Sequence, residues 1–177
     1  MQTDFKDLSR ICNNIERAIR LIPHKAAVLA VNFSKERFVK KNWIDTSEQT
    51  WKKTKKRKGS TLIKSGRLKR SIREVHVGAD YAIIGTDVPY ARVHNDRETI
   101  EGVELVHTHE RRAHKRKAYT RSGKRIKAGT VRSHVVKSHK RKYKRTFIQR
   151  KFIGQSQHLT NLLSNMIQTE IHKAIQE

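Results

Sequence analysis

The segment TLIKSGRLKRSI, residues 61–72, lies where the sequence changes from helical to β-strand patterning. Its hydroxyls, glycine and cations would suit a phosphate-binding loop, but a scaffold role fits its place in the chain better. We expect it to lead from a helical region into the first strand, anchored by the burial of Leu62, Leu68 and Ile72. Its cations would point outward to a neighbour or to DNA: Lys64, Arg67, Lys69 and Arg70.

An amphipathic helix is predicted before this segment. Apolar residues at spacings of three and four form one stripe: Phe5, Leu8, Ile11, Ile15, Ile19 and Ile22. Pro23 is expected to end this helix or to begin the next one. A helical pattern then continues through Ala26, Leu29, Ala30 and Phe33 toward Phe38 and Trp43. Residues 52–58, KKTKKRK, carry six positive charges in seven positions, which predicts a solvated loop or an anion-contacting loop.

The segment is followed by strand-like sequence. SIREVHV (71–77) and YAIIGTDV (81–88) are separated by Gly78-Ala79-Asp80, which predicts a β-hairpin. Pro89 then suits a helix or turn start.

At the C-terminus, Ser156 can cap an amphipathic helix. One face of that helix is apolar: Leu159, Leu162, Leu163, Met166, Ile167, Ile171 and Ile175.

Between these parts the composition changes abruptly. Residues 107–145 contain 16 Lys or Arg and one acid, Glu110, and too few apolar residues for a core. The segment is either an internal disordered basic tail or a long two-stranded arm with its tip near residues 121–129. An ordered arm of this composition would need neighbours in an assembly to hold it. The order helix, sheet, arm, helix predicts an α+β fold: N-terminal helices, a small antiparallel sheet, the arm and a C-terminal amphipathic helix.

The charge of the whole chain restricts the possible partners. Its 41 Lys and Arg against 16 Asp and Glu give a net charge of +25, and self-repulsion of this size favours an anionic partner or an assembly. Nucleic acid, an acidic protein ring and a membrane surface are the candidates.

The single cysteine, Cys12, excludes an intrachain disulfide and is expected to be a small core thiol in a reducing compartment. We expect no membrane span and no signal peptide, and therefore synthesis and retention in a cytoplasm-like setting.

Catalysis is not expected. His107, His109 and His114 lie close in sequence, but one carboxylate among many cations makes a metal site unfavourable. A metal-dependent nuclease is the enzyme alternative, and it would lose activity in His107→Ala and His109→Ala. His76 and His94 are expected to make structural hydrogen bonds. We predict no catalytic residue, no metal and no cofactor.

The arm is suited to salt-sensitive, sequence-independent contact with phosphates, because Tyr119 and Tyr143 stand among its cations. The alternative is that its charges meet acidic patches on partner subunits. The contact residues expected in the arm are Arg111, Arg112, Lys115, Arg116, Lys117, Arg121, Lys124, Arg125, Lys127, Arg132, Lys137, Lys140, Arg141, Lys142, Lys144 and Arg145.

Four segments together resemble the phage virion morphogenesis family, which includes tail-completion proteins of Mu-like and P2-like phages. They are FSKERFVKKNW (33–43), TLIKSGRLKRSI (61–72), IIGTDVPYARVHN (83–95) and RKFIGQSQHL (150–159). The residues that match the family motifs are Ser65, Gly66, Leu68, Ile72, Gly85, Tyr90, Ala91, His94, Phe152 and Gly154. The chain departs from the pattern at Asp96-Arg97-Glu98, where the family usually has glycines, and at Lys151, where it usually has a proline.

The resemblance implies a structural virion protein that forms a ring at the phage neck or tail top. By this implication residues 1–96 and 146–177 form one ring-forming α+β body, and 97–145 form an inserted basic arm, since the family's connection there is shorter. The expected partners are further copies in a six- or twelve-fold ring, portal, adaptor or tail proteins, and packaged double-stranded DNA, with no membrane. The protein would be made in the host cytoplasm and located in the virion. The alternative, from charge alone, is a ribosomal- or nucleoid-type nucleic-acid-binding protein.

Overall fold

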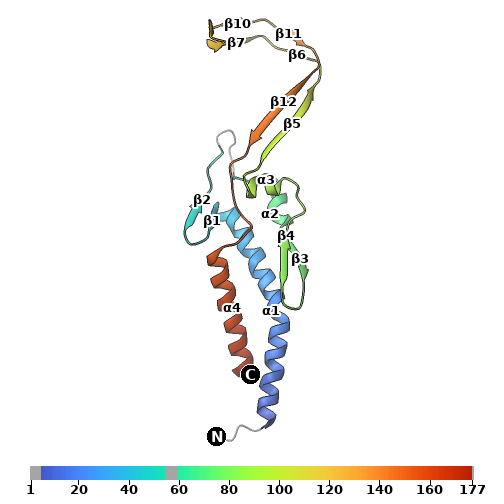
Figure 1. Cartoon of the computed structure of the whole chain (residues 1–177), viewed down its shortest axis with the longest axis vertical. Helices are drawn as coiled ribbons and strands as arrows, with labels where there is room; N and C mark the ends of the chain where they lie inside the picture. Colours follow the sequence, from blue (N-terminus) through green and yellow to red (C-terminus); the bar gives the residue numbers. More distant parts are fainter. Residues whose placement is uncertain (1–4, 55–59, 177) are drawn as a thin grey trace. The chain divides into compact units, whose positions relative to one another are not determined.

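The computed structural model describes residues 5–54 and 60–176, and the chain divides into two compact units (Figure 1). The body comprises Met1–Glu98 and Phe147–Glu177, and the arm comprises Thr99–Thr146. The body combines helices with short antiparallel strand pairs, and the arm consists of paired strands. The fold is therefore α+β, as predicted.

Helix α1 (Phe5–Lys40) is one continuous helix, so the prediction that Pro23 would separate two helices is wrong. An internal proline removes a backbone hydrogen bond and typically costs about 3 kcal/mol. Pro23 is itself buried, and the next buried residue of the helix is Ala27. His24 Nδ1 lies 3.5 Å from Glu74 in the hairpin, and Lys25 forms an ion pair with Glu170 of helix α4. Both contacts lie directly after the proline and connect this part of α1 to the hairpin and to α4.

The C-terminal helix α4 (Gln157–Gln176) lies antiparallel beside α1 (Figure 1). The predicted cap is confirmed, because Ser156 Oγ accepts a hydrogen bond of 3.1 Å from the Leu159 N–H. The same hydroxyl donates to the Ile44 carbonyl at 2.7 Å. Most of the predicted apolar face is only partly buried, and Leu162 and Ile175 are exposed.

Strands β1 (Asn42–Ile44) and β2 (Glu48–Thr50) follow α1 as an antiparallel pair. Trp43, which the helical pattern was expected to reach, lies in β1, because Lys41 adopts a positive φ of 57° and ends the helix. The predicted hairpin is confirmed as β3 (Arg73–Val77) and β4 (Ala82–Gly85), with a bulge between Glu74 and His76. Two short helices flank this hairpin: α2 (Arg67–Ser71) and α3 (Ala91–Asn95).

The body has one main hydrophobic cluster: Phe38, Trp51, Leu68, Ile72, Val88, Ala91 and Phe152. Phe38 lies at its centre, with ring centroids 5.5 Å from Trp51 and 4.9 Å from Phe152. Leu68 and Ile72 are 2% and 0% exposed, and Leu62 packs against the cluster. Leu62, Leu68 and Ile72 thus anchor segment 61–72 to the core, as expected.

A buried arginine connects α1 to the β1–β2 pair. Arg37 is 1% exposed, and its Nη1 donates to Asn42 Oδ1 at 3.1 Å while its Nε donates to the Phe33 carbonyl at 3.2 Å. Asn42 Nδ2 in turn donates to Glu48 at 2.6 Å. The hydrogen bonds satisfy a cation that would otherwise be costly to bury.

The arm is an antiparallel ladder built from four strand pairs. The first is β5 (Thr99–Val106) with β12 (His139–Thr146), and the second is β6 (His109–Arg111) with β11 (His134–Val136). The third is β7 (His114–Arg116) with β10 (Gly129–Val131), and the last is β8 (Tyr119–Arg121) with β9 (Lys124–Ile126). Ser122 and Gly123, with φ of 48° and 75°, form the tip within the predicted range. No residue of 99–146, all of which are described, is buried.

Candidate functional site

The arm repeats one structural unit every five residues. Each unit is a strand of three residues followed by a two-residue break, and strands begin at residues 109, 114, 119, 124, 129, 134 and 139. The register is the same from Thr99↔Thr146 near the body to Arg121↔Lys124 at the tip. Breaks therefore face each other across the ladder: 107–108 with 137–138, 112–113 with 132–133, and 117–118 with 127–128.

Most breaks carry a cation followed by a small residue. These are Arg112-Ala113, Lys117-Ala118, Lys127-Ala128, Arg132-Ser133 and Lys137-Ser138. The repeat was missed in the sequence reasoning above, although it is visible as HERRA, HKRKA and YTRSG on one strand and KRIKA, GTVRS and HVVKS on the other. A search for internal periodicity would have found it.

Histidines close four of the breaks. In each case Nδ1 bonds the carbonyl oxygen two residues earlier, which belongs to the first residue of a break. The distances are 2.9 Å for His109, 3.2 Å for His114, 3.1 Å for His134 and 2.9 Å for His139. A carbonyl can only accept, so Nδ1 carries the proton. These side chains replace ladder hydrogen bonds that the break removes.

Four histidines of the arm, His109, His114, His134 and His139, thus have a structural role within the ladder. Across the residues that the structure describes, no group of three His, Cys, Asp or Glu is arranged to hold a metal ion. Cys12 is exposed, so the prediction of a core thiol is wrong, because its position on α1 faces away from the packed side. No described helix is long and apolar enough to cross a membrane.

All sixteen predicted contact cations of the arm are exposed. Ion pairs within the described arm engage three of them, close to the body: Arg141 and Arg145 with Glu104, and Lys144 with Glu101. Beyond this ladder, residues 109–137 contain eleven Lys or Arg and one acid, Glu110. The uncompensated charge is therefore concentrated in the outer, repeating part of the arm.

The motif residues of the body lie together around its core. Gly66 has a φ of +72° at the start of α2, where the Arg70 guanidinium donates to the Ser65 carbonyl at 2.7 Å. Arg70 therefore folds back on its own loop instead of pointing outward. Ala91 and Phe152 join Leu68 and Ile72 in the hydrophobic cluster. Gly85 lies close to the Val75 side chain, and Gly154 has a φ of +144°. The last two motif residues, Tyr90 and His94, line the cavity described below.

Asn95 and Arg150 connect two of these motifs and were not predicted as site residues. Asn95 Oδ1 accepts hydrogen bonds from the N–H groups of Phe152 at 3.0 Å and Ile153 at 3.1 Å. The Arg150 guanidinium donates twice to the Lys52 carbonyl, at 3.0 and 3.2 Å. Both side chains bond to backbone groups that are distant in sequence. A local sequence pattern cannot predict such contacts. Of the basic loop 52–58, residues 55–58 lie outside the described part of the chain.

A cavity of about 360 Å³ lies beside these residues, lined among others by Ser65, Tyr90, His94 and Arg150. His94 was expected to make a structural hydrogen bond, but its buried Nδ1 has no partner among the described residues. Its ring instead lies edge-on to two aromatic rings, with centroid distances of 6.4 Å to Tyr90 and 5.6 Å to Phe147. Burial lowers the pKa of His94, and the charge of Arg150 lowers it further. His76 is exposed, and its ring centroid lies 5.7 Å from that of Tyr81. Among the described residues, its side chain has no hydrogen-bond partner.

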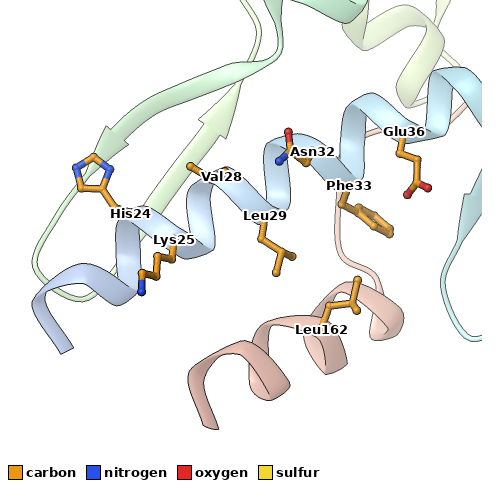
Figure 2. Close-up of a pocket in the computed structure, with 8 residues that line it drawn as sticks. All are labelled: His24, Lys25, Val28, Leu29, Asn32, Phe33, Glu36 and Leu162. Carbon is orange, nitrogen blue, oxygen red and sulfur yellow. The ribbon is translucent and has the colours of Figure 1, made fainter. Parts of the chain in front are cut away.

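A second cavity, of about 810 Å³, forms a groove along α1 beside α4 (Figure 2). Its apolar lining comes from Val28, Leu29, Phe33 and Leu162. Charged and polar residues border it: His24, Lys25, Asn32 and Glu36. Exposed apolar side chains continue along α1 toward its N-terminus, where Phe5 is 84% and Leu8 55% exposed.

Comparison with known protein families gives one match. The family model of the phage virion morphogenesis family matches residues 40–172, about three quarters of the chain. Comparisons with curated proteins and with solved structures give no significant match. The matched region contains the motif residues of the body described above and most of the core cluster. This protein belongs to the phage virion morphogenesis family.

Proposed function

We propose that the protein is a non-enzymatic structural component of the virion, located at the neck or tail top as a head–tail connector or tail-completion protein. Family membership supports a role in phage assembly and an association with the virion. In this proposal several copies form a closed ring, six- or twelve-fold. Portal, adaptor or tail proteins adjoin it, and the basic arm contacts packaged double-stranded DNA or neighbouring neck proteins.

The uncovered apolar surface of α1 is the main observation that supports the proposed ring. Figure 1 shows the N-terminal turns of α1 extending past the end of α4. Phe5 and Leu8 on these turns are exposed, and the groove at Val28 and Leu162 is open. These are two different apolar surfaces of one chain. When the first surface of one copy packs into the second surface of the next, the contact is heterologous, which is the type that builds rings.

The arm supports the same proposal. An isolated two-stranded hairpin is marginally stable in water, and this arm has no buried residue. Copies brought together around a channel would supply neighbours to each arm, and duplex DNA would offset their charge.

Mass measurement of the purified chain by light scattering tests the ring. The wild-type protein should have the mass of a closed oligomer, and Val28→Glu should shift it toward the monomer because it places a carboxylate in the groove. Gln168→Glu is the matched control, since it adds the same charge at an exposed polar position of α4. A wild-type chain that is monomeric at all concentrations would contradict the ring.

A nucleoid- or ribosomal-type nucleic-acid-binding function remains the second candidate, and the net charge of +25 favours it. Deleting residues 107–145 separates the two. A ring protein keeps its oligomeric mass through the body, whereas a protein whose function is nucleic-acid binding alone loses its main activity and has no ring to retain.

A further inference from the structure

We propose that the outer arm is a modular binding element for duplex DNA, in which each five-residue unit delivers cations to the phosphate backbone. This inference deepens the proposed function. It rests on the proposed function for one point, namely that the DNA is the packaged DNA of a virion. The binding itself is a property of the arm and can be measured on the purified chain.

The distribution of charge is the first argument. Near the body, Glu101 and Glu104 pair with Arg141, Lys144 and Arg145, so this ladder is partly neutralised. The outer part, residues 109–137, has eleven cations and one acid, and no ion pair is found between its described residues. Cations exposed at this density repel one another, and an anionic partner along the arm would offset this repulsion.

The geometry of the repeat is the second argument. A five-residue unit spans at most about 16 Å at 3.3 Å per residue, and duplex DNA presents one charge per ~1.7 Å of its axis. Each unit therefore meets several phosphates wherever it lies along the duplex. Two facing breaks, such as those that contain Lys117 and Lys127, place cations on both edges of the ladder. A repeating cation array matches a uniform linear polyanion and needs no particular base sequence.

The apolar residues of the arm favour DNA over an acidic protein. Protein interfaces usually have an apolar centre. The outer arm instead pairs its half-buried aliphatic residues with rings across the ladder, at His109↔Val136, His114↔Val131 and Tyr119↔Ile126. Within residues 109–137, one large aliphatic side chain is exposed, that of Val135, with an exposed fraction of 63%. The solvent-facing surface offered to a partner is therefore mainly charge.

The uniform register permits a direct test by removing one unit from each strand. Deleting 114–118 together with 127–131 joins residue 113 to 119 and 126 to 132, and every remaining pair keeps its partner. The deletion removes Lys115, Arg116, Lys117 and Lys127. The matched variant keeps the full length and changes the same four residues to glutamine.

Binding to a fluorescent linear duplex of about 30 base pairs is measured across a salt series for the full chain and both variants. Each cation that contacts phosphate contributes about 0.9 to the slope of log affinity against log salt, so both variants should lose up to ~3.6 from the slope. Between about 50 and 200 mM salt this corresponds to a roughly hundredfold smaller loss of affinity than in the wild type. The triple variant Arg141→Gln, Lys144→Gln, Arg145→Gln should lose less slope per residue, because these cations already have acidic partners.

Equal slopes in wild type and both variants would overturn the inference, as would a glutamine variant that binds like wild type while the deletion does not. Tighter binding of the wild type to poly-glutamate than to the duplex would point to an acidic protein instead and would also overturn it. Salt-dependent DNA binding by a chain that forms no ring would support the inference and contradict the proposed ring. Rings whose arm variants bind DNA like the wild type would support the ring and contradict the inference.

Discussion

Asn95 and Phe152 are joined across the body by a hydrogen bond of 3.0 Å from the Phe152 N–H to Asn95 Oδ1. The same oxygen accepts from Ile153, and Phe152 is 1% exposed in the hydrophobic cluster. One amide therefore fixes the segment that returns from the arm to the core. It also connects two of the segments through which the family was identified.

Removing this amide should destabilise the body. In Asn95→Ala the N–H groups of Phe152 and Ile153 lose their acceptor, and we expect the free energy of unfolding to fall by about 2–3 kcal/mol. Urea denaturation followed by tryptophan fluorescence measures this, since Trp51 lies in the same cluster. Asn95→Asp is the control that keeps an acceptor oxygen and should lose less. Equal losses in both variants would contradict the role assigned to the oxygen.

The buried Arg37 should be similarly important. Arg37→Met keeps much of the apolar volume but leaves Asn42 Oδ1 without its donor, and we expect a loss of about 2–3 kcal/mol in unfolding free energy. Lys40→Met is the comparison on the same helix, because Lys40 is exposed and pairs with Glu36 at the surface, where an ion pair contributes about 0–1 kcal/mol. A loss for Arg37→Met as small as the one for Lys40→Met would show that the buried network contributes little.

Gly66 should be intolerant of a side chain. Its φ of +72° is unfavourable for other residues, and an added Cβ would lie 2.8 Å from Arg70 Nη1. We expect Gly66→Ala to lower the melting temperature through a cost of about 1–2 kcal/mol. Gly129→Ala is the matched control in the arm, because Gly129 has open space around its Cβ position and does not need a positive φ. Comparable melting temperatures for the two variants would contradict the strain at Gly66.

The half-buried ring of His94 predicts a dependence of stability on pH. Its pKa in the folded protein lies below the ordinary value of 6.5, chiefly because burial disfavours the charged ring. The unfolded state therefore binds a proton first as the pH falls. The stability that His94 contributes is present above about pH 6.5 and is lost as the pH falls from there through the lowered value.

Thermal melts of wild type and His94→Phe between about pH 5 and 8 measure this contribution. The difference in stability between the two proteins should change in favour of the variant as the pH falls, because phenylalanine cannot take up the proton. A difference that stays constant over this range would contradict the lowered pKa of the half-buried imidazole.

The parts of the fold that local sequence determines were predicted, and those that depend on distant contacts were not. The hairpin at 71–88 and the Ser156 cap follow from turn and capping residues next to the elements they define. Pro23 misled the prediction because it is buried in the folded chain. The residues beside it, His24 and Lys25, contact Glu74 and Glu170, which no window of sequence contains.

The candidate site shows the same division. The basic segment was predicted from its charge, but the sequence left a disordered tail and a two-stranded arm open, and the structure shows the two-stranded arm with its tip in the expected range. The roles of Asn95 and Arg37 could not be predicted, since each bonds to groups that only the folded chain brings near. The five-residue repeat is different, because the histidines at 109, 114, 134 and 139 display it in the sequence itself.

Electron microscopy of the virion, with the protein identified by a bound antibody fragment, tests the central claim most directly. The account predicts a ring of copies at the neck or tail top, with density for the arm against the DNA in the channel. A protein that is absent from the virion, or present there only as single copies away from the neck and tail top, would contradict it.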